Sequence, residues 1–199
     1  MKHSIILFAV ACILISCGGI KKKVLVMAKG DLKIEGNKIT IKDGSGHTEK
    51  EMMLSGNKQE IVIDNNGTIS SEKINENGYY ILNLKTDTVV GSYQRLGKDL
   101  NNQTTITFEQ LKVIIDSLNN LVLGKNVSAS NKNYLIAPNQ LALISANIEA
   151  NIYGPYRQVS ATQELGPNGK EPEIYKFYTN KEMRELIESR AKMIPSSNN

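Results

Sequence analysis

The chain of 199 residues contains no tryptophan and only two cysteines, and both shortages narrow the classes of function open to it. Tryptophan is one of the usual aromatic platforms for stacking sugars, and that platform is missing here. Both cysteines, Cys12 and Cys17, lie near the N-terminus. The rest of the chain can therefore form no disulfide, no thiolate nucleophile and no cysteine metal site.

Histidine is also scarce, because His47 is the only one beyond the first few residues. One histidine without cysteine argues against a zinc site. Asp43, Ser45 and His47 lie within five residues, but a catalytic triad brings its groups together from separate elements. We interpret segment 43–47 as a glycine-rich turn with an exposed histidine, and we expect no catalytic residue, metal or cofactor. Catalysis by paired carboxylates leaves no local sequence signature and stays open as an alternative to a non-enzymatic protein.

Net charge is small. The sequence has 24 basic and 20 acidic residues, for a formal charge of +4. Removal of residues 1–16 takes away one lysine and leaves a charge of about +3, with both signs mixed along the chain. This balance argues against a nucleic-acid partner. The remaining residues suffice for one domain with a substantial core, or for two small domains.

The N-terminus has the layout of a secretory signal. Lys2 precedes an apolar run from Ile5 to Ile15, and the small residue Ser16 stands directly before Cys17. The apolar run has eleven residues, whereas a membrane-spanning helix needs about 20. The segment is therefore too short to cross a bilayer core as a helix.

The sequence Leu14-Ile15-Ser16-Cys17 resembles the lipobox of bacterial lipoproteins. The resemblance implies a signal peptide at 1–16, cleavage before Cys17, a lipid on the Cys17 thiol and acylation of the new amino terminus. Cys12 also follows a small residue, but the apolar run before it is too short and continues after it. The chain after Cys17 resembles no family.

Residues 17–23 are expected to form a lipidated basic tether. By resemblance to lipoprotein sorting rules, glycine rather than aspartate at position 18 implies transfer to the outer membrane. The serine before Cys17 and the many asparagines resemble lipoproteins of Bacteroidota, and the tether lacks the acidic export tag of that group. We therefore expect the periplasmic face of the outer membrane. Lys21, Lys22 and Lys23 would either contact anionic lipid head groups or lie in a solvated linker.

The fold class predicted from periodicity is α+β, with a β-rich region at 24–100 and an α+β region at 101–194. About seven short alternating segments separated by turns such as Gly36-Asn37 predict an antiparallel β-sandwich or small barrel in the N-terminal half. Segment 43–46 is expected to be one of the loops between these strands.

Two amphipathic helices and additional short strands are predicted in the C-terminal half. Thr107 and Gln110 form a capping box before a helix ending near Gly124, and its apolar stripe is expected to pack on the sheet. A second capping box at 179–182 begins a helix that runs to Pro195. Segment 134–165 fits either strands or a helix, and we favour strands. A short strand is expected at 174–178 and a disordered tail at 195–199.

Candidate binding residues gather late in the chain. Tyrosine interleaved with arginine is typical of interface hot spots and also stacks on glycans, while tyrosines at a half-buried sheet rim are the structural alternative. The candidates are Tyr153, Tyr156, Arg157, Tyr175 and Tyr178. In addition, Asp87-Thr88-Val89 and Asp116-Ser117-Leu118 resemble the O-glycosylation acceptor of Bacteroidota, which implies Thr88 and Ser117 as modification sites.

These features lead to an expected function. The chain is predicted to be a non-catalytic outer-membrane lipoprotein and a structural or assembly component of a cell-envelope complex, such as a secretion or transport machine. The alternative is a glycan- or peptidoglycan-binding lipoprotein on the same anchor. The expected partners are the membrane, through the N-terminal lipid, and other envelope proteins, with a glycan as the alternative ligand.

Overall fold

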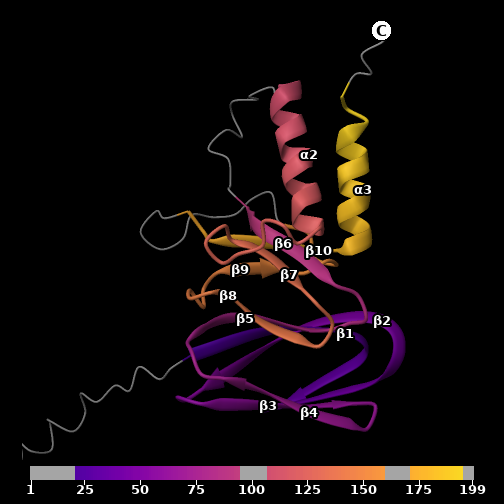
Figure 1. The fold of residues 1–199 in the computed structure, drawn as a ribbon. Coiled ribbons are helices and arrows are strands. Elements are labelled where there is room, and N and C mark those ends of the chain that lie inside the picture. Colours follow the sequence, from indigo (N-terminus) through magenta and orange to yellow (C-terminus); the bar gives the residue numbers. More distant parts are fainter. Residues whose placement is uncertain (1–20, 95–106, 160–170, 195–199) are drawn as a thin grey trace, which may run out of the picture.

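The computed structural model describes residues 21–94, 107–159 and 171–194, which form three layers (Figure 1). The first layer is sheet A, of order β4-β3-β2-β1-β5-β8. Its strands are β1 (Lys21–Glu35), β2 (Lys38–Ser55), β3 (Gln59–Asn65), β4 (Thr68–Ile74), β5 (Gly78–Leu84) and β8 (Gln140–Ser145). The second layer is sheet B, of order β7-β6-β10-β9. Its strands are β6 (Val89–Gln94), β7 (Asn133–Ile136), β9 (Asn151–Tyr153) and β10 (Ile174–Thr179). The third layer is the helix pair α2 (Phe108–Val122) and α3 (Asn180–Ala191).

The predicted β-rich first half followed by two helices is confirmed, but the expectation of antiparallel pairing is wrong in part. Within the described residues, three strand pairings are parallel: β1 with β5, β2 with β3, and β9 with β10. Alternating hydrophobicity reports which face of a strand is buried, but it does not report the direction of the neighbouring strand. Both sheets are therefore mixed.

A bulge inside β2 replaces the loop that was expected at 43–46. Lys29 of β1 pairs with His47, but Asp31 pairs with Lys42, so four residues of β2 lie opposite Gly30. Gly30 has φ +101°, and a Cβ there would lie 2.2 Å from the carbonyl oxygen of Lys42. The bulge bends the long β1–β2 hairpin and helps sheet A to curl. The segments expected as separate strands on either side of the bulge are therefore continuous in β1 and in β2, and residues 21–94 contain six strands.

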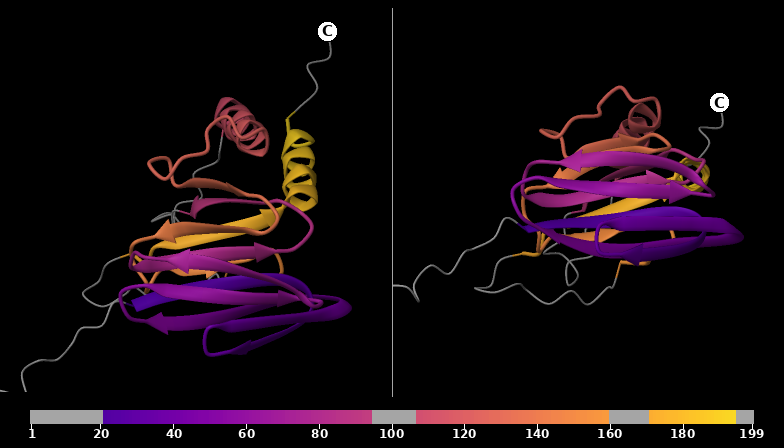
Figure 2. Two further views of the ribbon diagram at one scale, coloured as in Figure 1. Left: turned by 60° about the horizontal axis from the view of Figure 1, so that its bottom comes forward. Right: turned by 90° about the horizontal axis from the view of Figure 1, so that it is seen from below.

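Sheet A curls around one apolar core and packs a second core against sheet B (Figure 2). In β1, Val24 and Val26 point into the first core, whereas Leu25 and Met27 point into the second. The strand β5 alternates in the same way, and all seven of its residues are buried. Because β1 and β5 are covered on both faces, they read as continuous apolar runs rather than as alternating ones.

The two predicted regions interleave in space. Strand β6 belongs to the first region of the sequence but forms the second layer, and β8 comes from the second region but extends sheet A. Within the described part of 134–165, the favoured strands are confirmed as β7, β8 and the short β9, but 148–150 form no strand. Residues 160–165 lie outside the described residues. The predicted strand at 174–178 is confirmed as β10.

The three lysines of the expected tether belong to the folded domain instead. Lys21, Lys22 and Lys23 are the first residues of β1, between β2 and β5. Lys22 is fully buried, and its ammonium donates to the carbonyl of Gly56 at 2.6 Å. Lys23 lies 3.2 Å from the Glu51 carboxylate. The three lysines are therefore part of one end of sheet A. Residues 17–20 and the tail at 195–199 lie outside the described residues.

Both helices begin where the capping boxes predict, at Thr107 and Thr179. The expectation that the first helix packs its stripe on a sheet is wrong for most of its length, because α2 packs on α3 and only its C-terminal end reaches sheet B. Helix α3 follows β10 without a loop and leaves the sheet steeply, and α2 lies beside it. The two helices are not consecutive in the chain, because β7 to β10 lie between them. We call this packed pair the helical hairpin, and it projects from the sandwich (Figures 1 and 2).

Candidate functional site

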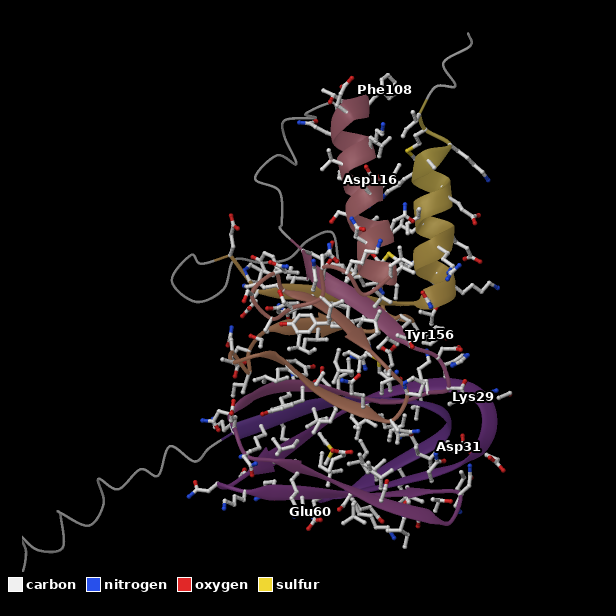
Figure 3. All side chains as sticks on the ribbon, viewed as in Figure 1. Lys29, Asp31, Glu60, Phe108, Asp116 and Tyr156 are labelled. Atoms are coloured by element: carbon white, nitrogen blue, oxygen red, sulfur yellow. The ribbon has the colours of Figure 1, made fainter. Side chains whose placement is uncertain are left out.

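The expected tyrosine cluster is divided among three places in the fold. The first is the connection after β9, which lies against the bulge of β2. Tyr156 stacks on His47 with ring centroids 4.5 Å apart and an interplanar angle of 17°. Arg157 donates to the carbonyl of Glu49 at 3.2 Å, and its Nε lies 3.7 Å from the Glu49 carboxylate. In Figure 3, Tyr156 lies on the same side of the molecule as the bend of the β1–β2 hairpin, where Lys29 and Asp31 of β1 are labelled.

Lys176 of β10 holds the connection at 154–157 in place through hydrogen bonds to its backbone. Its ammonium donates to the carbonyls of Gly154 at 2.6 Å, Arg157 at 2.7 Å and Pro155 at 3.3 Å. Burial lowers the pKa of Lys176, and the Glu182 and Glu49 carboxylates only partly oppose this shift. The arrangement ties sheet B to the bulge of sheet A. Tyr156, Arg157 and Lys176 all make contacts that join the two sheets. We therefore interpret this set of contacts as a structural brace.

Lys85 adds a second buried cation to the brace. Its side chain follows β5, and its ammonium lies 4.5 Å from the Tyr156 ring centroid and 3.3 Å from the Tyr156 hydroxyl. Burial lowers the pKa of Lys85, while the carboxylates of Glu49, Glu182 and Asp87 oppose that shift. Sequence reasoning selected neither lysine as a site residue, because a lysine within or beside a strand carries no signal of burial.

Asp43, Ser45 and His47 do not meet as a catalytic group. Asp43 accepts a hydrogen bond from the Asn66 side chain at 2.8 Å, whereas His47 stacks on Tyr156. Ser45 is exposed on the bulge. His47 is exposed, as expected, but it belongs to the brace and not to a free turn.

Tyr175 lies in a second place, at the opposite end of the sheets. Its hydroxyl donates to the Glu173 carboxylate at 2.6 Å. The Ser145 hydroxyl donates to the same carboxylate at 2.9 Å, and the Lys132 ammonium donates at 3.2 Å. Burial would raise the pKa of the Glu173 carboxyl, but these hydrogen bonds outweigh burial and hold that pKa below its usual value of 4.5.

Tyr175, which bonds to this carboxylate, also contacts two other tyrosine rings. Tyr175 makes edge-to-face contacts with Tyr93 and Tyr134, at centroid distances of 5.7 and 5.9 Å. The Lys132 ammonium lies 4.4 Å from the centroid of Tyr93. Two hollows of about 380 and 590 Å³ adjoin Lys132 and form what we call the Lys132 groove.

Residues of the Lys132 groove come from four separate segments. The first hollow is lined by Ala129, Lys132, Tyr134, Leu143, Ile144, Ser145, Ala146, Asn147, Glu173 and Tyr175. The second is lined by Tyr93, Ser130, Asn131 and Lys132. Of these, only Tyr175 was singled out from the sequence. Lys132 has φ +54°, as expected of a tight turn, but nothing local pairs it with a carboxylate 41 residues away.

The third place is the helical hairpin. Tyr178 is half-buried under it and packs against the apolar core that α2 and α3 share. Tyr153 is half-buried in β9. Ser117 is exposed on α2, and Thr88 is half-buried in the connection between β5 and β6. Cys17 lies outside the described residues.

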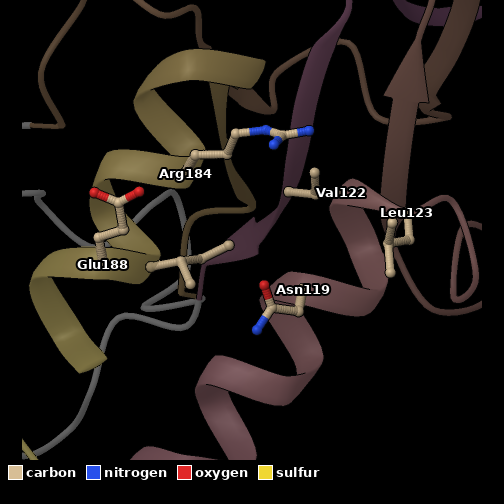
Figure 4. Close-up of a pocket in the computed structure, with 6 residues that line it drawn as sticks. Asn119, Val122, Leu123, Arg184 and Glu188 are labelled. Carbon is tan, nitrogen blue, oxygen red and sulfur yellow. The ribbon is translucent and has the colours of Figure 1, made fainter.

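Large apolar side chains remain exposed on the hairpin. Phe108 is 54% exposed, Val113 68%, Leu123 65% and Met193 63%. Figure 3 shows Phe108 at the tip of the hairpin, away from the sheets. A hollow of about 320 Å³ lies between the helices and is lined by Asn119, Val122, Leu123, Arg184, Ile187 and Glu188 (Figure 4). A second hollow, of about 520 Å³, lies on α2 beside Glu109, Gln110, Val113 and Ile114.

Comparison with known proteins found no matching family model, curated protein or solved structure. Within residues 21–94, 107–159 and 171–194, no group of three or more His, Cys, Asp or Glu side chains is placed to hold a metal ion. No helix in those same ranges is long and apolar enough to span a membrane.

Proposed function

We propose that this protein is a lipid-anchored, non-catalytic component of a cell-envelope assembly, and that the helical hairpin is its docking element for another envelope protein. One observation carries the proposal. Helix α2 packs on α3 with only part of its apolar surface, and Phe108 and Val113 stay exposed on a pair of helices that projects from the sandwich. Large apolar side chains that stay exposed on a projecting element are typical of protein interfaces.

The charges on the hairpin favour a protein over a bilayer as the partner. On α2, Glu109 and Asp116 accompany Lys112, and α3 alternates acidic and basic residues in the same way. Helices that lie in anionic membranes carry an excess of lysine and arginine on their polar face. Mixed charge around exposed apolar residues instead suits the polar rim and apolar centre of a protein interface.

The proposed anchor would hold the sandwich close to the membrane. Four residue steps separate Cys17 from the start of β1 at Lys21. An extended chain spans at most about 3.6 Å per residue, so these steps reach about 14 Å. Sheet A would then lie near the bilayer, and the hairpin, on the far side of sheet B, would point toward partners away from the anchor (Figure 1).

A pull-down from detergent-solubilised native envelopes tests this function. Tagged wild-type protein would be compared with Cys17→Ala, which removes the lipid acceptor, and with Val113→Glu, which places a charge on the exposed face of α2. Lys112→Gln is the matched control, because it makes the same change in net charge at the neighbouring, exposed position. Each captured set would be identified by mass spectrometry.

We expect the wild type and Lys112→Gln to retain a reproducible set of envelope proteins. Val113→Glu should lose the protein that docks on the hairpin, while its thermal midpoint stays near that of the wild type because position 113 is exposed. Cys17→Ala should lose the membrane fraction. An empty capture with wild-type protein, or full capture by Val113→Glu, would overturn the assignment of the hairpin.

A further inference from the structure

The Lys132 groove combines apolar walls with hydrogen-bonding groups that carry no net charge. Lys132 and Glu173 form an ion pair at 3.2 Å, and among the described residues that line the two hollows no other side chain is charged at neutral pH. The remaining polar groups are hydroxyls and side-chain amides, from Ser130, Asn131 and Asn147. An anionic ligand would be repelled by Glu173 and a cationic ligand by Lys132, so the groove suits a ligand without net charge.

Hydrogen bonds position the Glu173 carboxylate in the wall of the groove. The Glu173 carboxylate is held by Tyr175, Ser145 and Lys132 together. Glu173 in turn holds the Lys132 ammonium above the Tyr93 ring. An ammonium has three N–H donors, and the hydrogen bond to Glu173 uses one of them. Lys132 therefore has further donors available on the border between the two hollows, where its side chain is 45% exposed.

The apolar part of the wall lies in the first hollow. Leu143, which is 36% exposed, lines it together with the largely buried Tyr134 and Tyr175, which are 8% and 1% exposed. Binding sites for small ligands commonly have volumes of about 300–1,000 Å³, apolar walls and a few placed polar groups, and the two hollows fall within that range.

We propose that the Lys132 groove binds a neutral oligosaccharide. A sugar ring has apolar C–H faces that fit the apolar wall beside Leu143, and hydroxyls that accept from Lys132 and bond to Asn131 and Asn147. Two adjoining hollows suit two successive sugar units, with Lys132 between them. Because the groove lies at the end of the sheets and the hairpin stands above sheet B, saccharide binding and protein docking use different surfaces of the molecule.

The test is calorimetric titration of the full-length lipoprotein in mild detergent with defined oligosaccharides. The probes are chitotetraose and maltotetraose, which are neutral, and tetragalacturonate, which is anionic. The first variant is Lys132→Asn, which removes the ammonium and tolerates the left-handed backbone at φ +54°. The second is Ser130→Trp, which fills the groove from an exposed position. The matched control is Lys125→Asn, a change at an exposed lysine outside the groove.

We expect at least one neutral probe to bind, Lys132→Asn and Ser130→Trp to weaken that binding at least tenfold, and Lys125→Asn to leave it unchanged. Binding of neither neutral probe, binding of the anionic probe alone, or equal affinity in Ser130→Trp would overturn the proposal. Val113→Glu separates the two surfaces, because it should bind saccharide like the wild type while it loses the docked protein. Saccharide binding that fails alongside intact protein capture would refute the groove and leave the hairpin assignment standing.

Discussion

Replacing Lys176 with methionine would remove a buried ammonium and keep most of the aliphatic stem. The Lys176 side chain is only 8% exposed, and its three acceptors all belong to the connection at 154–157 that braces the two sheets. In the variant, these carbonyls would have to find water, and the connection would come away from the bulge of β2. We expect this release to lower the free energy of unfolding.

The size of the effect follows from two opposing contributions. Hydrogen bonds to charged groups are worth about 1.5–3 kcal/mol each, and unpaired buried acceptors cost about 1–3 kcal/mol. Burial of the ammonium works in the other direction, as the lowered pKa of Lys176 shows, so methionine recovers part of the loss. A net loss of about 2–4 kcal/mol is expected. For a chain of this length, that corresponds to a decrease in Tm of about 4–16 °C.

Urea denaturation followed by far-ultraviolet circular dichroism measures this loss. Lys181→Met is the matched control, because Lys181 is 86% exposed and makes only a helical ion pair with Glu185 at 3.8 Å. The control should change stability by less than about 0.5 kcal/mol. If Lys176→Met unfolded within about 0.5 kcal/mol of the wild type, the brace would contribute nothing and the reasoning would be wrong.

Close packing at Gly91 predicts a loss of about 1–3 kcal/mol in Gly91→Ala, because the new Cβ would lie 2.4 Å from Cδ1 of Phe177. Gly46→Ala is its control in the same urea titration, since nothing lies within 4 Å of a Cβ there. The lowered pKa of Glu173 contributes stability above pH 4.5 that is lost as pH falls through the folded pKa. Glu173→Gln should therefore flatten the acid side of a stability–pH curve, and an unchanged slope would contradict this. Lys22→Met should lower the urea midpoint, because Lys22 is fully buried and donates to two carbonyls of the β2–β3 turn. A midpoint equal to that of the wild type would show that those bonds are not needed.

The elements that sequence reasoning placed well depend on neighbours along the chain. Thr107 with Gln110, and Thr179 with Glu182, form the predicted capping boxes, because each box joins residues three positions apart. Strands β5 and β10 were recognised from their apolar residues and flanking turns. The bulge of β2 was misread as a loop because its glycines signal a turn whether or not the strand continues beyond it.

The candidate sites depended on contacts between distant segments, and most of their residues were missed for that reason. The expected cluster of Tyr156, Tyr175 and Tyr178 is divided among the brace, the Lys132 groove and the core under the hairpin. Residues near one another in the sequence, such as Tyr175 and Tyr178, lie on opposite faces of β10, because successive side chains of a strand alternate. Lys132 and Glu173 meet only because β7 and β10 flank β6.

By itself, the sequence determined the local structure of this protein: where the helices begin, which segments are strands, and how the N-terminus resembles that of a lipoprotein. Each of these depends on side chains within a few positions, where a capping hydrogen bond or an alternation of burial is already specified. The tertiary structure alone decided the direction of strand pairing, the burial of Lys22 and Lys176, and the convergence of the Lys132 groove. Those outcomes follow from which distant strands become neighbours, and that choice is made by packing the whole core rather than by any single segment.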